Sequence, residues 1–273
     1  MKLGIITQKY TADEFQNIKN KGLDFVEFCI NYNSDNPNSH MNFLNKIDEI
    51  KQNLDSVNLP IASIGRWGGF KIMKGNSTNS TTLEFNLEEI EIDKMLINAA
   101  AKCNCPIYVT GCNYIEESSL FDNYKNTIYY FKDLIDYGKA KNVKIAVYNC
   151  RWNNYITSEP AWSAILSNVK ELYIKYDPSH CIYNNGDYLH EIAKWGKRFA
   201  HVHLKGSLSV DGKRFDDPPA GLDQTNWSKF FAILYSIGYN GTLSIEPHSE
   251  IWQGELGEKG IKYTIDYMKN FIL

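Results

Sequence analysis

Histidines and carboxylates gather in three short stretches in the second half of the sequence. The stretches read Tyr-Asp-Pro-Ser-His, His-Val-His-Leu-Lys and Ser-Ile-Glu-Pro-His, and they place Asp177, His203 and Glu246 at equivalent depths of three consecutive runs. One imidazole and two carboxylates suit a divalent ion of manganese, zinc, cobalt, iron or magnesium and leave positions open for water or substrate. We therefore predict a metal site made by these three residues. The alternative is a hydrogen-bonded cluster in which His203 bridges the two acids without an ion.

Other residues suited to binding or catalysis end the same runs or neighbouring ones. His201 and His203 are two positions apart, so both imidazoles face one side of a strand, with His201 the deeper. We expect His201 to be a core residue or to orient a metal ligand. The remaining candidates at the ends of runs are Glu27, Trp67, Tyr148, His180, Lys205, His248 and Trp252.

Eight short runs of β-branched, aliphatic and aromatic residues would position these side chains. Several runs are apolar at successive positions, as expected of strands that are buried on both faces in a parallel sheet. The runs cover 3–7, 25–30, 61–65, 106–111, 144–149, 172–177, 200–205 and 242–247.

Helix-forming segments separate these runs. Thr11 and Glu14 form a capping box, and apolar residues recur at helical spacing over 43–54 and 84–102. The loop over 67–82 is long and rich in Gly, Asn, Ser and Thr, and it is either a mobile lid or an ordinary surface loop. Further helices are predicted after Ser119 and after 158–160, and from Asp187, Thr225 and about Glu258.

The alternation of runs and helices predicts a single (β/α)8 TIM-barrel domain over residues 1–273. An open doubly wound sheet is the alternative, but no Gly-rich phosphate-binding turn follows any run. In such a barrel the catalytic side chains come from the carboxyl ends of the strands. The candidate residues stand at these ends.

Composition limits the partners and the compartment. The chain carries a formal net charge of −3 and has a pI of about 6.1, so it offers no bulk positive field for nucleic acid. No apolar run is long enough to cross a membrane, and the first residues do not resemble a signal peptide. We expect a cytoplasmic protein without nucleic-acid or membrane partners. Association into a homo-oligomer through the helices is left open.

The second half of the chain resembles the sugar phosphate isomerase/epimerase family, the xylose isomerase-like TIM barrels. The resemblance is good over residues 140–273 and diffuse before them. The pair formed by Tyr-Asp-Pro-Ser-His and the later His-Val-His-Leu-Lys is its most specific part. The matching stretches are 143–150, 176–180, 201–206, 221–227 and 238–248.

The resemblance implies a divalent metal held by one side chain from each of strands 5, 6, 7 and 8. Asp177, His203 and Glu246 match the ligands on the last three strands, and His180 matches a substrate-contacting histidine. On strand 5, Tyr148 replaces the glutamate that is usual in the family, so metal binding is expected to be weak or absent. By the period of two, Tyr148 faces inward, and its hydroxyl is expected in the site where that glutamate would sit. The remaining matches are Lys205, where the family has a polar contact, and Glu27, an acidic residue at the end of strand 2.

These features favour a metal-dependent isomerase or epimerase of a small carbohydrate, a sugar or sugar phosphate, through an enediolate-type intermediate. Glu246 would be the base, with His180 and Tyr148 as further catalytic residues. The basic residues expected near the mouth either meet a phosphate or are solvated loop charges; they are Arg66, Arg151 and Lys205. Substrate binding is assigned to Glu27, Trp67, Lys205, His248 and Trp252.

Two other functions remain open. A single base and a single acid also suit β-elimination, which predicts a dehydratase or lyase of a sugar or cyclitol. A barrel that lost the carboxylate of strand 5 would bind carbohydrate without catalysis. Metal-dependent abasic-site endonucleases share the barrel, but the acidic pI argues against this activity.

Overall fold

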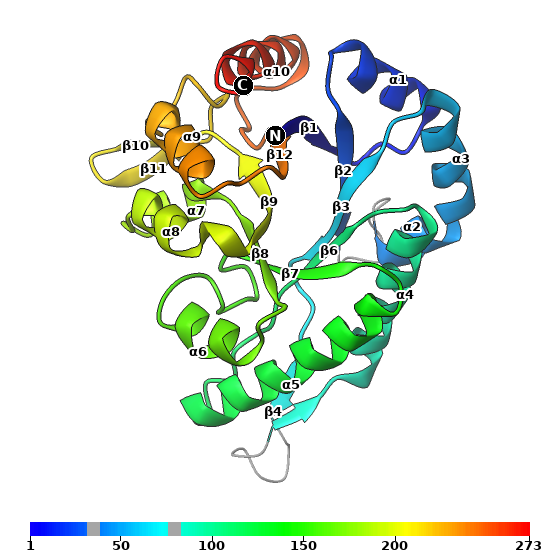
Figure 1. Cartoon of the computed structure of the whole chain (residues 1–273), viewed down its shortest axis with the longest axis vertical. Helices are drawn as coiled ribbons and strands as arrows, with labels where there is room; N and C mark the ends of the chain where they lie inside the picture. Colours follow the sequence, from blue (N-terminus) through cyan, green and yellow to red (C-terminus); the bar gives the residue numbers. More distant parts are fainter. Residues whose placement is uncertain (32–38, 76–82) are drawn as a thin grey trace.

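The chain folds into a closed barrel of eight parallel strands, as the sequence predicts. The computed structural model describes residues 1–31, 39–75 and 83–273. The strands are hydrogen-bonded in the order β1–β2–β3–β6–β7–β8–β9–β12, and β12 pairs with β1 to close the barrel. They lie at the centre of the molecule with the helices around them (Figure 1). Their bounds are β1 (Lys2–Thr7), β2 (Phe25–Asn31), β3 (Ile61–Trp67), β6 (Ile107–Thr110), β7 (Lys144–Tyr148), β8 (Tyr173–Tyr176), β9 (Phe199–Leu204) and β12 (Thr242–Ile245).

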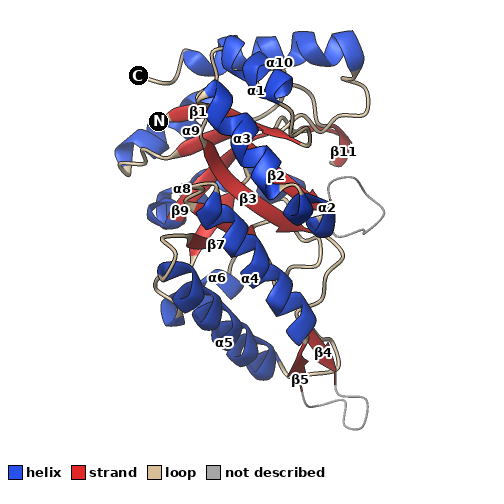
Figure 2. Ribbon diagram, turned by 90° about the vertical axis from the view of Figure 1, so that its right-hand side faces the viewer, coloured by secondary structure: helices blue, strands red, loops and turns tan. Residues whose placement is uncertain are grey.

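Helices follow the strands and cover their outer faces. Figure 2 shows α3, α4 and α5 over one side of the barrel. The predicted caps form at Thr11, which accepts a hydrogen bond from the backbone of Glu14, and at Ser119 and Asp187. The helices are α1 (Ala12–Asn20), α2 (His40–Asn45), α3 (Ile47–Val57), α4 (Leu87–Lys102), α5 (Leu120–Lys139), α6 (Ala161–Asn168), α7 (Pro178–Tyr183), α8 (Tyr188–Trp195), α9 (Trp227–Ser236) and α10 (Gly254–Lys269), with the short 3-10 helix η1 (Gly196–Arg198).

Some elements differ from the prediction or were missed. The helix predicted over 43–54 is divided into α2 and α3 at Lys46. The short helix α7 and two hairpins were not predicted. The hairpins pair β4 (Met73–Gly75) with β5 (Leu83–Phe85), and β10 (Leu208–Val210) with β11 (Lys213–Asp216). Residues 76–82 of the predicted lid lie outside the described residues.

Alternation along the strands divides the apolar side chains into two clusters. Ile107, Val109, Ala146 and Tyr148 form a small cluster, whereas the intervening Val147 belongs to the larger core that packs strands against helices. Because neighbouring side chains of a strand point to opposite faces, the smaller cluster is the interior of the barrel. The predicted inward direction of Tyr148 is therefore correct.

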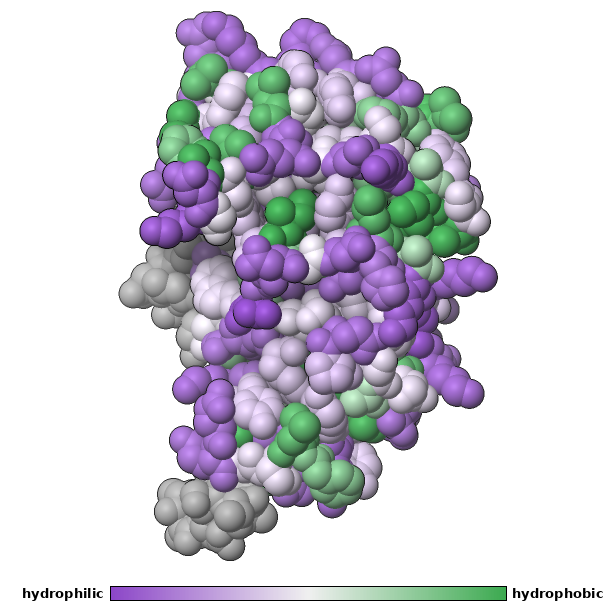
Figure 3. Space-filling model, turned by 90° about the vertical axis from the view of Figure 1, so that its left-hand side faces the viewer, coloured by the Kyte–Doolittle hydropathy of each residue, from purple (hydrophilic) through white to green (hydrophobic). Residues whose placement is uncertain are grey.

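None of the helices in the described part of the chain is both long and apolar enough to cross a bilayer. On the face drawn in Figure 3, apolar residues form separate groups among hydrophilic ones.

Arg66 does not reach the mouth of the barrel, so it is neither a phosphate contact nor a solvated loop charge, the two alternatives expected from the sequence. It is fully buried on the outer side of β3, where it donates to Asp93 Oδ1 at 2.8 Å and pairs with Glu89 of α4. The hydroxyls of Tyr108 and Tyr130 donate to the same Asp93 at 2.5 and 2.7 Å. A buried network of this kind attaches α4 to the end of β3.

The substitution Arg66→Met should destabilise the fold. It leaves the carboxylates of Asp93 and Glu89 buried without their counter-charge, which costs about 3–5 kcal/mol in comparable pairs. Urea denaturation followed by circular dichroism measures the change in the free energy of unfolding. Lys262→Met in the exposed pair with Asp266 is the control and should leave stability unchanged within error. A loss below about 1 kcal/mol for Arg66→Met would contradict this interpretation.

Candidate functional site

A cavity of about 470 Å³ opens at the carboxyl ends of the strands. This is where the fold brings together side chains from strands that are distant in the sequence. Aromatic rings, lysines and histidines form much of its wall. Among the residues that line it are Lys9, Cys29, Trp67, Tyr148, Trp152, Lys175, His180, Lys205, Glu246 and His248.

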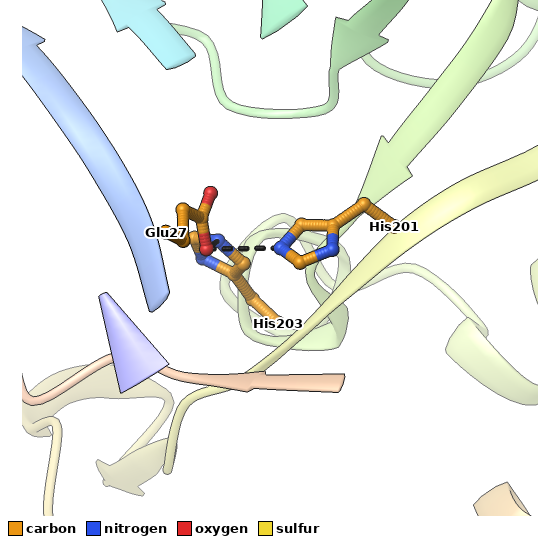
Figure 4. A group of neighbouring side chains, drawn as sticks. All are labelled: Glu27, His201 and His203. Carbon is orange, nitrogen blue, oxygen red and sulfur yellow. Dashed lines mark hydrogen bonds and ion pairs between the residues drawn. The ribbon is translucent and has the colours of Figure 1, made fainter. Parts of the chain in front are cut away.

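Glu27 of β2 lies between two imidazoles of β9 (Figure 4). Its Oε2 accepts hydrogen bonds from Nε2 of His201 at 2.9 Å and from Nε2 of His203 at 2.8 Å. All three side chains are fully buried. Burial opposes the charge of Glu27, but the two imidazoles hold the pKa of this carboxyl well below its usual range.

The two histidines differ in charge. Burial lowers the pKa of His201, whose Nδ1 lies 2.6 Å from the hydroxyl of Thr242. For His203, burial is outweighed by Glu27 and Glu246, which raise its pKa. Both ring nitrogens of His203 face carboxylate oxygens, because Nδ1 lies 2.8 Å from Glu246 Oε2. The two acids on either side of His203 therefore favour its protonated form.

Asp177 joins this group from the end of β8. Its Oδ1 accepts a hydrogen bond from the backbone of Ser179 and caps the unpredicted helix α7. Asn149 holds the Asp177 backbone through two hydrogen bonds of 2.9 Å. These contacts leave Asp177 Oδ2 buried and facing the ammonium of Lys205.

Lys205 lies between Asp177 and Glu246. Its Nζ is 3.1 Å from Asp177 Oδ2 and 3.7 Å from Glu246 Oε2. Despite the burial of all three groups, this ammonium lowers the pKa of both carboxyls, and they raise its own. His180 lies 3.4 Å from the same Nζ, and burial lowers its pKa to about 4, so it is neutral.

The donor set formed by Asp177, His203 and Glu246 fits a divalent cation. Asp177 Oδ2, a nitrogen of His203 and a carboxylate oxygen of Glu246 all lie within 4.8 Å of one another. Loss of the Nδ1 proton would make His203 a ligand while Nε2 still donates to Glu27, a common way to orient a metal-bound histidine. The spacing of Glu27, His201 and His203 would also admit an ion. There, however, both Nε2 atoms already donate to one carboxylate oxygen.

Tyr148 reaches the cavity with its ring but not with its hydroxyl. The hydroxyl donates to the backbone carbonyl of Trp152 at 2.9 Å, and burial raises the pKa of the phenol. A side chain on Gly111 would collide with the end of the ring, so this glycine makes room for it. The expectation that the hydroxyl enters the site in place of a glutamate is corrected by this geometry.

Trp67 and His248 lie at the cavity as the sequence analysis expected. The Trp67 ring stands edge-on to Tyr148 and His203, at centroid distances of 5.7 and 6.0 Å. His248 is half-exposed, and its Nδ1 lies 2.9 Å from Asp217 Oδ2. Trp252, by contrast, lines a separate small hollow behind the mouth and not the main cavity.

Lys175, Cys29 and Lys9 line the cavity but were not singled out from the sequence. Lys175 stands two residues before Asp177 on the same strand, so the period of two was a usable signal. Cys29 accepts a hydrogen bond from Nε1 of Trp67 at 2.6 Å. Lys9 lies in the first half of the sequence, where the resemblance to the family is diffuse, and no pattern there marks it as a candidate site residue.

A family model described as a xylose isomerase-like TIM barrel matches residues 15–271. The chain belongs to this family. A search of curated proteins gives no match.

Several solved structures share the whole fold. The 3-keto-D-glucoside 4-epimerase from E. coli is 15% identical, with a TM-score of 0.75 over 99% of both chains. The D-allulose 3-epimerase from Methylomonas sp. in complex with D-allulose is 16% identical, with a TM-score of 0.74 over 99% of this chain and 96% of that one. The probable 3-DHS dehydratase AsbF from Bacillus anthracis is 14% identical, with a TM-score of 0.74 over 98% and 99%. At these identities the likeness concerns the fold.

The position of the Tyr148 hydroxyl is tested by Tyr148→Phe. Loss of its hydrogen bond to Trp152 should lower the free energy of unfolding by about 1 kcal/mol. The dissociation constant for a sugar, measured by calorimetry, should change less than about twofold. The reason is that a hydroxyl already bonded to the backbone contributes little to the binding of a ligand. A larger loss of affinity with unchanged stability would mean that the hydroxyl contacts the substrate.

Proposed function

We propose that the protein is a metal-dependent isomerase or epimerase of a small carbohydrate. The observation that carries this proposal is the convergence of Asp177, His203 and Glu246 within 4.8 Å beside a cavity of about 470 Å³. The family and the structural likeness to two sugar epimerases support a carbohydrate as the substrate. The three side chains would hold the ion through Asp177 Oδ2, His203 Nδ1 and Glu246 Oε2. When bound, the ion would polarise the sugar carbonyl and stabilise charge on its oxygen.

Glu246 is suited to remove a proton from the carbon next to the carbonyl. Its side chain is 19% exposed, so it is accessible from the cavity, and Lys205 and His203 keep it ionised. A carboxylate in this state accepts a proton directly. The neutral His180 can donate or accept one hydrogen bond at each ring nitrogen, which suits the binding of sugar hydroxyls.

The absence of a second carboxylate on β7 favours isomerisation over epimerisation. An isomerase returns the proton to the adjacent carbon on the same face of the enediolate, so Glu246 alone would suffice. An epimerase must return it to the opposite face and needs a second group there. Tyr148 is a poor second group, because its hydroxyl is bonded to Trp152 and its pKa is raised.

A sugar dehydratase is the second candidate. In this reaction Glu246 would take a proton and a nearby acid would protonate the leaving hydroxyl. Lys205 is a protonated group at the right place, with its ammonium 3.7 Å from Glu246 and 3.4 Å from His180. Asp177 and Glu246 raise its pKa, which weakens it as an acid. The structural likeness to a probable dehydratase is compatible with this candidate.

Incubation with ketohexoses in deuterated water tests the proposal. With manganese or cobalt added, wild-type protein should incorporate deuterium next to the carbonyl and form an aldose or an inverted ketose, both detected by NMR. Formation of a deoxy-keto sugar would favour the dehydratase instead. Glu246→Gln should lower the exchange by about 100-fold or more, since general base catalysis contributes this much.

Glu250→Gln is the matched control, because this exposed glutamate follows the same strand and does not line the cavity. It should exchange deuterium at the wild-type rate. Undiminished exchange in Glu246→Gln would refute the role of Glu246. Binding of sugars without any exchange would favour the non-catalytic barrel.

Metal retention is expected to depend on Asp177 and His203. The side chain of Asp177→Asn can still accept the hydrogen bond that caps α7. After dialysis, Asp177→Asn and His203→Ala should each retain at most about one tenth of the metal that the wild-type protein retains. Inductively coupled plasma mass spectrometry measures the retained metal, and circular dichroism checks the fold. His190→Ala removes an exposed histidine and should retain the wild-type amount. Equal retention in all four proteins would exclude this metal site.

A further inference from the structure

Lys175 is a buried charged residue of the cavity that the proposed reaction does not use. It lies on β8 two residues before Asp177, it is 3% exposed, and it lines the cavity. Its Nζ stands 5.0 Å from the centre of the Trp67 ring. The aromatic face provides a modest attraction for a cation, but it accepts no conventional hydrogen bond.

The other buried cations in the described ranges have anionic partners, and Lys175 does not. Lys205 pairs with Asp177 and Glu246, and Arg66 pairs with Asp93 and Glu89. No carboxylate oxygen of a described residue lies within the 4.0 Å of an ion pair from Lys175 Nζ. Its charge acts on Asp177 and Glu246 only from a distance, where it helps to lower their pKa values.

An ammonium in such a place is costly unless its donors are satisfied. The three N–H groups of Lys175 therefore depend on whatever enters the cavity. An anion would satisfy them best, since hydrogen bonds between charged groups are about twice as strong as neutral ones.

The charges along the cavity wall point to the same kind of ligand. Lys9, Lys175 and Lys205 line the cavity, whereas Glu246 is its single lining carboxylate among the described residues. The lining thus has more ammonium groups than carboxylates, although the formal net charge of the chain is −3. Lys205 is already neutralised by its two acids, and Lys9 is exposed at the rim. Lys175 is therefore the buried lysine of the cavity that forms no ion pair with a described carboxylate.

We propose that Lys175 binds an anionic oxygen of the substrate, so that the carbohydrate carries a carboxylate or a phosphate. This inference rests on the proposed function only in taking the ligand to be a carbohydrate. It does not depend on proton transfer or on metal, and binding tests it without turnover.

Calorimetric binding of three compounds tests the proposal. D-arabinitol is the neutral probe, D-arabinonate carries a carboxylate, and D-arabinose 5-phosphate carries a phosphate. Wild-type protein should bind at least one of the anions about tenfold more tightly than D-arabinitol, and the stronger of the two identifies the anionic group. Lys175→Met should reduce this preference to within about twofold while D-arabinitol binds as before.

Two further variants separate a specific contact from the general field. Lys9→Met removes a cavity-lining lysine at the rim and should keep the preference for the anion. Lys175→Arg keeps the charge and should recover part of the preference. An unchanged D-arabinitol affinity in Lys175→Met excludes a folding defect. The proposal is wrong if the wild-type protein has no preference for an anion, if Lys175→Met retains it, or if Lys9→Met alone removes it.

The outcome is distinguishable from failure of the proposed function. A preference for anions that depends on Lys175 would stand even if no sugar exchanges deuterium. Conversely, exchange that depends on Glu246 together with equal affinities for all three probes would refute the role of Lys175 alone.

Discussion

Two carboxylates hold the imidazolium of His203, Glu27 at Nε2 and Glu246 at Nδ1, each at 2.8 Å. Charges buried at the end of a barrel persist only where opposite charges and hydrogen bonds surround them. The three residues come from β2, β9 and β12, so their contacts cross the closure of the barrel through β1. A shift of one residue in any of these strands would turn its side chain away from the others. This pairing therefore constrains the strand register on which the cavity depends.

The loss of the glutamate expected on β7 changes the charge balance of the mouth. Asp177 and Glu246 remain as acids, and Lys205 already forms ion pairs with both, at 3.1 and 3.7 Å. Lys175 adds a second ammonium to the same wall. A metal ion at this site must therefore compete with a lysine for the same oxygens. An anionic substrate meets no such competition, because Lys175 has no described carboxylate at ion-pair distance.

Whether an expectation about a site residue was correct depended on the direction in which its side chain points. Alternation along β7 predicted that Tyr148 points inward, and it does. The hydroxyl nevertheless turns to the carbonyl of Trp152, a residue four positions later whose loop conformation no pattern predicts. Arg66 was expected at the mouth, but the same alternation that turns Trp67 inward sends Arg66 outward to Asp93. Trp252 lies in another hollow because the chain bends after β12.

The sequence by itself determined the barrel and the strand ends that carry its chemistry. Runs of apolar residues, helix caps and the spacing of Asp177, His203 and Glu246 are local patterns, and the period of two converts them directly into inward-facing positions. Only the tertiary structure decided which groups neutralise one another. Hydrogen bonds and ion pairs act over a few ångströms between atoms of different strands. The pairing of Lys205 with two acids, and the isolation of Lys175 beside Trp67, therefore follow from barrel closure and side-chain direction, which no single stretch of sequence contains.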